Sequence, residues 1–236
     1  RDRPTLAFPF AAPSVSGSLA EVGGNAETQA RLLLWSVERT IAGLSELAQR
    51  GDHYPATRTH VVLPGSPNRG TFGGDGAYGE VKAALDAIVN KWSAETGWPD
   101  GVTLAQARIG WVAGTHLMGG NDALVPAAEA AGIHVWSPEE ISSQLMSLAS
   151  PESREQAKQA PLDLDLTGGL ADSGVSIAEL ARSVRGGEVT EASASESPAT
   201  VRALPNVSNP QQPAPAKVGD VTCSLDDLSL IHISEP

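Results

Sequence analysis

The sequence lacks the features that mark secreted, membrane-spanning or nucleic-acid-binding proteins. Its single cysteine, Cys223, cannot form an internal disulfide bond, and no apolar run approaches the roughly 20 residues that a membrane-spanning helix needs. Positive charge is also scarce, with 16 Lys and Arg against 28 Asp and Glu and a net charge of -12. Because like charges repel, we expect neither nucleic acid nor a membrane as partner. The single cysteine and the lack of a membrane-length apolar run make the cytoplasm the expected compartment.

Aromatic residues are few and unevenly placed. All ten lie between Phe8 and Trp136, so the last hundred residues contain none. Because aromatic side chains bury large areas in protein cores, we expect the ordered domain to span residues 1–150. We then expect a weakly ordered extension with one short helix over 151–185. Residues 186–222, rich in Pro, Ser, Ala and Glu, predict a flexible linker.

In the expected ordered domain, strands alternate with amphipathic helices. Apolar residues recur at helical spacing over Glu27–Arg50 and again over Ala77–Glu95. Short apolar runs bounded by glycine or proline predict strands at Leu6–Phe10, His60–Leu63 and Val102–Val112. Strands that alternate with helices of this length indicate a parallel sheet with helical crossovers, and therefore an α/β fold.

A further helix start is indicated by the stretch Ser137-Pro138-Glu139-Glu140. It places serine at the N-cap, proline in the first turn and glutamate three residues after the cap. In such a capping box, the serine and glutamate side chains each accept a hydrogen bond from a backbone N–H at the helix start. We therefore expect a helix that leads into the apolar residues from Ile141 to Leu148.

A glycine-rich loop that follows the strand at His60–Leu63 ends in a candidate catalytic pair, Tyr78 and Lys82. Residues four apart lie on one face of a helix, so the phenol and the ammonium are neighbours. A nearby cation favours the phenolate and lowers the tyrosine pKa, which suits proton donation to a ketone oxygen during carbonyl reduction. Ser66, just beyond the strand, can donate a second hydrogen bond to the same oxygen.

Other candidate sites are less well supported by the sequence. The loop Gly70–Gly76 lacks the Lys-Ser/Thr pair of a phosphate-binding P-loop and the spacing of a dinucleotide-binding turn after a strand, so we expect a substrate-side loop. The nucleotide-binding turn normally precedes such catalytic strands, and we expect this chain to lack that half. His60, His116 and His134 are scattered without metal-ligand spacing, so no metal site is predicted.

Three runs of sequence resemble the ketoreductase domain of type I fatty acid synthases, which is of the short-chain dehydrogenase/reductase type. They are FPFAAP (8–13), LPGSPNRGTFGGDGAYGEVKAALDAIVNKW (63–92) and IGWVAGTHLMGGND (109–122). The likeness is closer to the single-chain synthases of mycobacteria and related actinobacteria than to the fungal alpha subunit. It implies a partial Rossmann-like parallel sheet, the C-terminal half of a short-chain reductase fold.

The same resemblance implies NADPH-dependent reduction of a 3-oxoacyl group, carried on acyl carrier protein, to the 3-hydroxyacyl form. In that role Tyr78 would donate the proton, Lys82 would tune it and hold the nicotinamide ribose, and Ser66 would orient the substrate carbonyl. The nicotinamide and phosphate side would be lined by Gly110, Val112 and Thr115. Many family members add an asparagine from the preceding helix, but Glu27–Arg50 contains none.

The resemblance also implies partners, namely the remaining domains of the parent synthase, which we expect to be homo-oligomeric. The sequence opens without an initiator methionine, which is typical of a segment of a larger protein. Within residues 223–236 we expect the start of the next domain, because Val221–Leu228 resembles the lead-in to a ketosynthase. The last eight residues, Ser229–Pro236, resemble a translated sequencing adapter and are expected to have no fold or function.

Two other functions stay open from the sequence alone. One is a stand-alone, divergent short-chain reductase that binds its cofactor in a shortened way. The other is a non-catalytic structural or docking segment of a large multienzyme, in which Tyr78 and Lys82 have no chemical task.

Overall fold

The computed structural model describes residues 3–13, 15–21, 23–50, 58–70, 72–115, 119–175, 179, 180 and 184. The chain divides into a unit of residues 1–189 and a unit of residues 190–236, and the second unit lies outside the described residues. The expected linker and the expected start of a further domain therefore lie outside them as well. Most of the short helix expected within 151–185 falls outside the described part too.

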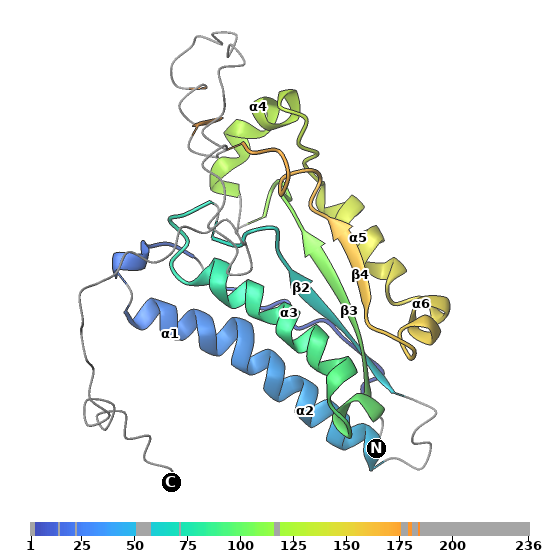
Figure 1. Cartoon of the computed structure of the whole chain (residues 1–236). Coiled ribbons are helices and arrows are strands. Elements are labelled where there is room, and N and C mark those ends of the chain that lie inside the picture. Colours follow the sequence, from blue (N-terminus) through green and yellow to red (C-terminus); the bar gives the residue numbers. More distant parts are fainter. Residues whose placement is uncertain are drawn as a thin grey trace, which may run out of the picture. The chain divides into compact units, whose positions relative to one another are not determined.

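The described part of the chain forms an α/β structure around a parallel sheet (Figure 1). Its strands are β1 (Leu6–Ala7), β2 (Thr59–Gly65), β3 (Val102–Ile109) and β4 (Leu162–Leu166). Its α-helices are α1 (Gly24–Ala30), α2 (Ser36–Gln49), α3 (Tyr78–Ala94), α4 (Val125–Ala130), α5 (Pro138–Ser147) and α6 (Pro151–Gln156). A π-helical segment, η2 (Arg31–Trp35), joins α1 to α2, and short 3-10 helices are η1 (Leu19–Glu21), η3 (Trp98–Asp100) and η4 (Gly119–Leu124).

The sheet has the order β1-β2-β3-β4, and each neighbouring pair is parallel. Strand order therefore advances in one direction across the sheet, as it does in one half of a doubly wound Rossmann-type fold. This confirms the expected partial Rossmann-like sheet. The parallel arrangement also brings the carboxyl ends of β2 and β3 to the same edge of the sheet, which is where such folds bind ligands.

Helices cover both faces of the sheet, giving three layers. On one face, α1–α2 and α3 lie side by side (Figure 1). Their apolar stripes pack on β2 and β3 in a cluster that includes Val37, Ile41 and Leu85. On the other face, Ile141 and Leu148 of the α5 region pack on the opposite side of the same strands. Alternate residues of β2 and β3 thus serve two separate cores, as strands buried on both faces require.

The expected helices and central strands are confirmed with changes at their ends. α3 differs from the expected Ala77–Glu95 by one residue at each end. α5 starts at Pro138, with the expected capping box between Ser137 and Glu140. The helix expected over Glu27–Arg50 begins earlier, at Gly24, and contains a π-helical segment that the apolar pattern did not indicate.

Two strands are shorter than expected. β1 ends at Ala7 instead of Phe10, because Pro9 has no N–H to donate and the Phe10 N–H turns back to the Phe8 carbonyl at 2.8 Å. β3 ends at Ile109 instead of Val112. The Gly110 N–H still donates to Leu166 O at 2.9 Å, beyond which the chain turns away into the loop at the edge of the sheet.

The sheet continues past residue 150, where we expected the ordered domain to end. Residues 162–166 form β4, which pairs with β3 in a regular parallel register. Leu162, Leu164 and Leu166 pack on the core beneath α5, whereas Asp163 and Asp165 are exposed. The alternation of leucine and aspartate is thus that of a half-buried edge strand. The leucines of β4 join a core that also includes Phe8, Phe10 and Trp136.

Candidate active site

A cavity of about 460 Å³ lies where β2 and β3 end. Its walls come from the segment after β2, the first turns of α3, the segment after β3 and residues near the N-terminus. The cavity is lined by every residue that we predicted for the site: Ser66, Tyr78, Lys82, Gly110, Val112 and Thr115. The fold therefore brings together residues that are up to 49 positions apart, although their chemical roles stay predictions.

Lys82 is buried beside Tyr78. Its side chain is 4% exposed, its ammonium donates a hydrogen bond to Pro64 O at 2.7 Å, and its Nζ lies 5.5 Å from the centre of the Tyr78 ring. Burial lowers the pKa of Lys82 from 10.5 to about 8. The side chain therefore stays mainly protonated at pH 7, as a positive charge held between the strand end and the phenol.

Tyr78 differs electrostatically from the expectation. Burial raises the pKa of its phenol above the ordinary value of 10, a hydrogen bond with the Ser66 side chain lowers it, and the Asp75 carboxylate raises it further. We expected Lys82 to produce a net lowering, but removal from water has the larger effect on a side chain that is 9% exposed. Tyr78 is consequently protonated at neutral pH and holds a proton that it can donate.

Ser66 is oriented by the segment that follows it. Its Oγ accepts a hydrogen bond from the Asn68 backbone N–H at 3.1 Å, so its hydroxyl proton is directed to other acceptors, of which the Tyr78 oxygen is one. The Asn68 side chain donates to Asp75 Oδ2 at 2.8 Å, and the same oxygen accepts from the Gly79 backbone N–H at 3.0 Å. Asn68 and Asp75 thus connect the end of β2 to the start of α3.

Sequence reasoning missed both Asn68 and Asp75. The one available signal was that Asn and Asp in glycine-rich loops often bond to nearby backbone groups. That signal does not indicate which distant backbone groups they reach.

The glycines of the loop serve close packing at the helix start. By letter, Gly74, Gly76 and Gly79 match the pattern G-x-G-x-x-G. A Cβ added to Gly79, however, would lie 2.6 Å from the Gly70 backbone nitrogen, and one added to Gly76 would lie 2.9 Å from a side-chain oxygen of Gln29. The backbone approach that these glycines permit is therefore to the protein itself, and not to a pyrophosphate as in a dinucleotide-binding turn.

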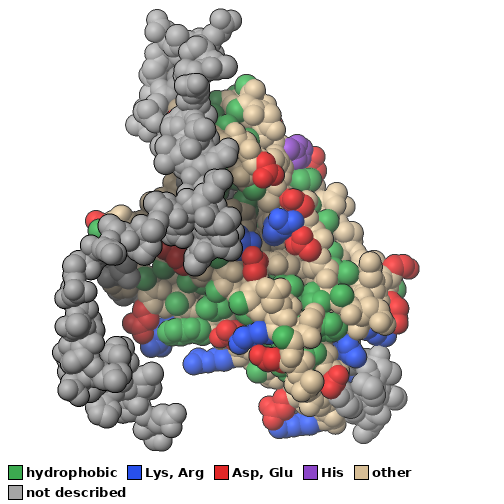
Figure 2. Space-filling view, viewed as in Figure 1, with side chains coloured by type: hydrophobic (Ala, Val, Ile, Leu, Met, Phe, Trp, Pro, Cys, Tyr) green, Lys and Arg blue, Asp and Glu red, His purple; other side chains and the backbone are tan. Residues whose placement is uncertain are grey.

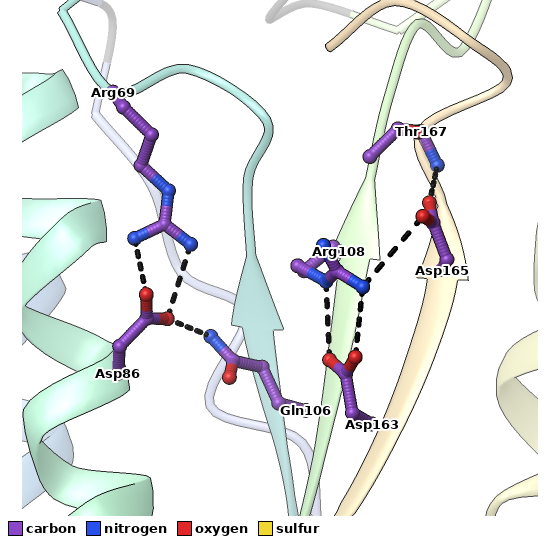
Figure 3. A network of polar contacts seen from close by, with 7 residues as sticks. All are labelled: Arg69, Asp86, Gln106, Arg108, Asp163, Asp165 and Thr167. Atoms are coloured by element: carbon purple, nitrogen blue, oxygen red, sulfur yellow. Dashed lines mark hydrogen bonds and ion pairs between the residues drawn. The ribbon is translucent and has the colours of Figure 1, made fainter. Parts of the chain in front are cut away.

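A polar network anchors the segment after β2 to α3 and β3 (Figure 3). Arg69, in the segment after β2, forms a two-pronged ion pair with Asp86 of α3, with distances of 2.5 and 3.1 Å. Asp86 also accepts a hydrogen bond from Gln106 of β3 at 2.8 Å. Beside it, Arg108 bonds to Asp163 on β4. The network joins the segment after β2, α3 and two strands next to the cavity.

The surface drawn in Figure 2 shows acidic and basic side chains interspersed over the described face, without a broad field of one sign. Within the described ranges, no three His, Cys, Asp or Glu side chains gather as they would around a metal ion. No helix in that part of the chain is long and apolar enough to cross a membrane. His60 is buried and bonds to Thr103 Oγ1 at 2.8 Å, and His134 stacks edge-on against Trp136.

The cavity suits the nicotinamide end of a dinucleotide. Its volume is near the lower end of the range for small-molecule sites, about 300 to 1,000 Å³. An ammonium has three donors, and Lys82 is bonded to one backbone acceptor among the described residues, so further donors are available to ribose hydroxyls. A turn that would hold the pyrophosphate and adenosine end is not found among the described residues.

Comparisons with known proteins place this segment within much longer relatives. No family model matches the chain. It is 38% identical over 165 residues to the fatty acid synthase alpha subunit hexA of Dothistroma septosporum, which is 70% of this chain and 10% of that protein. It is 36% identical over 165 residues to the fatty acid synthase subunit alpha of Saccharomyces cerevisiae, or 69% and 9% of the two proteins. The chain thus spans about a tenth of these relatives.

Solved structures show the fold independently. A 4-hydroxyisoleucine dehydrogenase complexed with NADH matches with a TM-score of 0.55 at 14% identity, covering 69% of this chain and 67% of that one. A short-chain dehydrogenase from Bacillus anthracis matches with a TM-score of 0.54 at 14% identity, covering 71% and 64%. The chain therefore has the fold of the short-chain dehydrogenases and is similar in sequence to a segment of fatty acid synthase alpha subunits.

Proposed function

From this similarity and the geometry of the cavity, we propose that the chain is the catalytic half of the ketoreductase in a type I fatty acid synthase. The reaction is NADPH-dependent reduction of a 3-oxoacyl group on acyl carrier protein to the 3-hydroxyacyl form. The observation that supports it most is the joint position of Ser66, Tyr78 and Lys82 in one cavity at the ends of β2 and β3. Such a cavity fits a small carbonyl substrate in an α/β fold.

The three side chains divide the proton chemistry between them. Ser66, whose Oγ already accepts the Asn68 N–H, donates its hydroxyl proton to the substrate carbonyl oxygen and orients it. Tyr78, protonated at neutral pH, transfers its proton to that oxygen as the carbonyl carbon is reduced. The resulting phenolate is stabilised by the Lys82 ammonium, which Pro64 O holds at the strand end.

The remaining residues of the cavity bind and position. A bound nicotinamide cofactor would supply the hydride that reduces the carbonyl carbon. Lys82 would hold its ribose, and the other nearby wall is formed by Gly110, Val112 and Thr115. Thr115 is itself fixed, because its hydroxyl donates to Val112 O at 3.0 Å.

The narrower form of the proposal concerns the parent protein. The relatives described above are fungal alpha subunits, whereas the sequence runs 63–92 and 109–122 resemble the single-chain synthases of mycobacteria. We propose a synthase of that single-chain type, homo-oligomeric and cytoplasmic. Sequencing the source gene on both sides tests this: a strand, a glycine-rich turn and a helix in frame upstream, with a ketosynthase downstream, would support it. A start codon and a stop codon directly at the ends would contradict it.

The catalytic proposal is tested by Tyr78→Phe in the full-length synthase that contains this segment. General acid catalysis typically contributes about 10²- to 10⁴-fold, so we expect ketoreduction to fall by at least about 100-fold, measured as oxidation of NADPH by a 3-oxoacyl thioester. Tyr54→Phe is the matched control, since Tyr54 is the other tyrosine of the sequence. Unchanged ketoreduction in Tyr78→Phe would instead favour a non-catalytic structural segment.

A further inference from the structure

A buried glutamine holds the turn that precedes Tyr78. Gln29 of α1 is 2% exposed, its Oε1 accepts a hydrogen bond from the Ala77 N–H at 2.8 Å, and its Nε2 donates to the Asp75 carbonyl at 3.3 Å. We infer that Gln29 is a positioning residue for Tyr78, because it fixes the turn from which α3 and the tyrosine emerge. The inference rests on the proposed function, since Tyr78 must be the proton donor for its position to affect a rate.

The Gln29 side chain packs closely against Gly76, where only glycine fits. Gly76 has a φ of +63°, and a Cβ there would lie 2.9 Å from Gln29 Oε1 and 3.0 Å from Ser16 O. On the same turn, the Gly76 N–H donates to Gly17 O at 2.9 Å. The turn is therefore held by a side chain from α1 and by the backbone near Gly17.

A primary amide is the side-chain group suited to this task. It presents one acceptor and one donor at the same end, matching the N–H of Ala77 and the carbonyl of Asp75. A carboxylate keeps the acceptor but loses the donor, and a thioether loses both. Because Gln29 is almost fully buried, each backbone group left without its partner would have to be compensated by movement of the turn.

Displacement of this turn would reach the site through two routes. The Asp75 carboxylate bonds to both Asn68 and the Gly79 N–H, so movement of Asp75 disturbs the segment that orients Ser66. Leu33, one turn after Gln29 on the same helical run, packs against the Tyr78 side chain. Gln29 thus lies on the helix from which many family members supply an asparagine, but it acts on the backbone before the tyrosine.

The chain offers a matched control at the other end of the same helical run. Gln49 of α2 also makes two hydrogen bonds through its amide, to Gly97 O at 2.7 Å and to Ser45 Oγ at 3.1 Å. Neither Gln49 nor its partners line the cavity. Gln49 is exposed and only donates, so Gln49→Met controls for loss of two amide hydrogen bonds from the same helical run without altering the turn before Tyr78.

The test compares Gln29→Met, Gln29→Glu and Gln49→Met in the full-length synthase, measuring kcat and KM for a 3-oxoacyl thioester across pH. For Gln29→Met we expect kcat to fall roughly 10- to 100-fold with KM little changed, because a small misplacement of a catalytic group has effects of this size. The alkaline limb of the kcat profile should move to lower pH, since water that reaches a loosened Tyr78 stabilises its phenolate. Gln29→Glu, which keeps the Ala77 bond, should have a kcat between those of Gln29→Met and the wild type.

The inference is overturned if Gln29→Met matches Gln49→Met in both kcat and the position of the alkaline limb. If Gln29→Met does not assemble into folded synthase, Gln29→Glu decides by kcat alone, because its added carboxylate disfavours the Tyr78 phenolate and itself moves the alkaline limb to higher pH. Tyr78→Phe separates this failure from that of the proposed function. When Tyr78→Phe abolishes ketoreduction and the Gln29 variants do not alter it, the positioning role alone is wrong. When Tyr78→Phe leaves ketoreduction intact, both proposals fall.

Discussion

Lys82→Met should change how the stability of the protein depends on pH. The folded pKa of about 8 is below the ordinary value of 10.5 because burial disfavours the charged ammonium. That difference of about 2.5 pH units, at about 1.4 kcal/mol per unit, means that burying the charge costs about 3 kcal/mol below pH 8. Above pH 10.5 the side chain is neutral in both the folded and unfolded states, and the cost disappears.

The sign follows from proton counting. Between pH 8 and pH 10.5 the unfolded chain binds more protons at Lys82 than the folded chain does, so the free energy of unfolding of the wild type rises with pH in this window. Methionine carries no charge at any pH. Relative to Lys82→Met, the wild type should therefore gain about 3 kcal/mol between pH 8 and 10.5. At pH 7 the cost of burying the charge favours Lys82→Met. The substitution also leaves Pro64 O without its donor, at a cost of about 1–3 kcal/mol, so the two effects partly cancel at that pH.

The measurement is urea unfolding followed by fluorescence of the five tryptophans, at intervals from pH 7 to 11. Lys91→Met is the matched control, because Lys91 lies on the same helix with its side chain 58% exposed. The reasoning is refuted if the gap between the wild type and Lys82→Met changes with pH no more than the gap for the control. It is also refuted if Lys82→Met becomes more stable relative to the wild type as the pH rises.

Two further predictions concern the stability contributed by His60 and Gly110. Burial and the nearby Arg154 charge lower the pKa of His60 from 6.5 to about 4, so the free energy of unfolding should fall by up to about 3 kcal/mol as the pH drops through this window. Urea unfolding should show that His60→Gln loses this dependence while the exposed His134→Gln keeps it. Gly110→Ala should destabilise by about 3 kcal/mol, because its Cβ would lie 2.3 Å from Thr167 O, whereas thermal unfolding of Gly43→Ala, with nothing within 4 Å, should show no such loss.

The elements that sequence reasoning located well are those with strong local signals. α3 carries its apolar residues at helical spacing. The residue types at Ser137 and Glu140 identify the two hydrogen bonds of the capping box. The position of Tyr78 beside Lys82, on the same face of α3, also follows from helical spacing alone. In each case the interactions that form the feature are between residues a few positions apart, so the sequence alone indicates them.

Elements that depend on distant partners were missed or misjudged. β4 reads as a polar extension until β3 and the α5 region supply its partners. The π-helical segment η2 was not predicted. Its wider turn keeps apolar residues four positions apart closer to one face, so the apolar pattern alone does not separate it from an α-helix. The pKa of Tyr78 could not be predicted either, because its main cause is burial, which depends on the whole cavity and not on the spacing to Lys82.

The side chains to which we assign the proposed proton chemistry are all held by groups within this part of the sheet. Ser66 is fixed by the Asn68 backbone, Lys82 by the Pro64 carbonyl and the turn before Tyr78 by Gln29, so each group is oriented by β2, its following loop or α1. A nucleotide-binding half is needed for none of these bonds. We therefore expect that half to determine cofactor affinity, whereas the described segment determines the protonation states at the carbonyl. Substitutions at Gln29 should accordingly change kcat and its pH profile more than the affinity for NADPH.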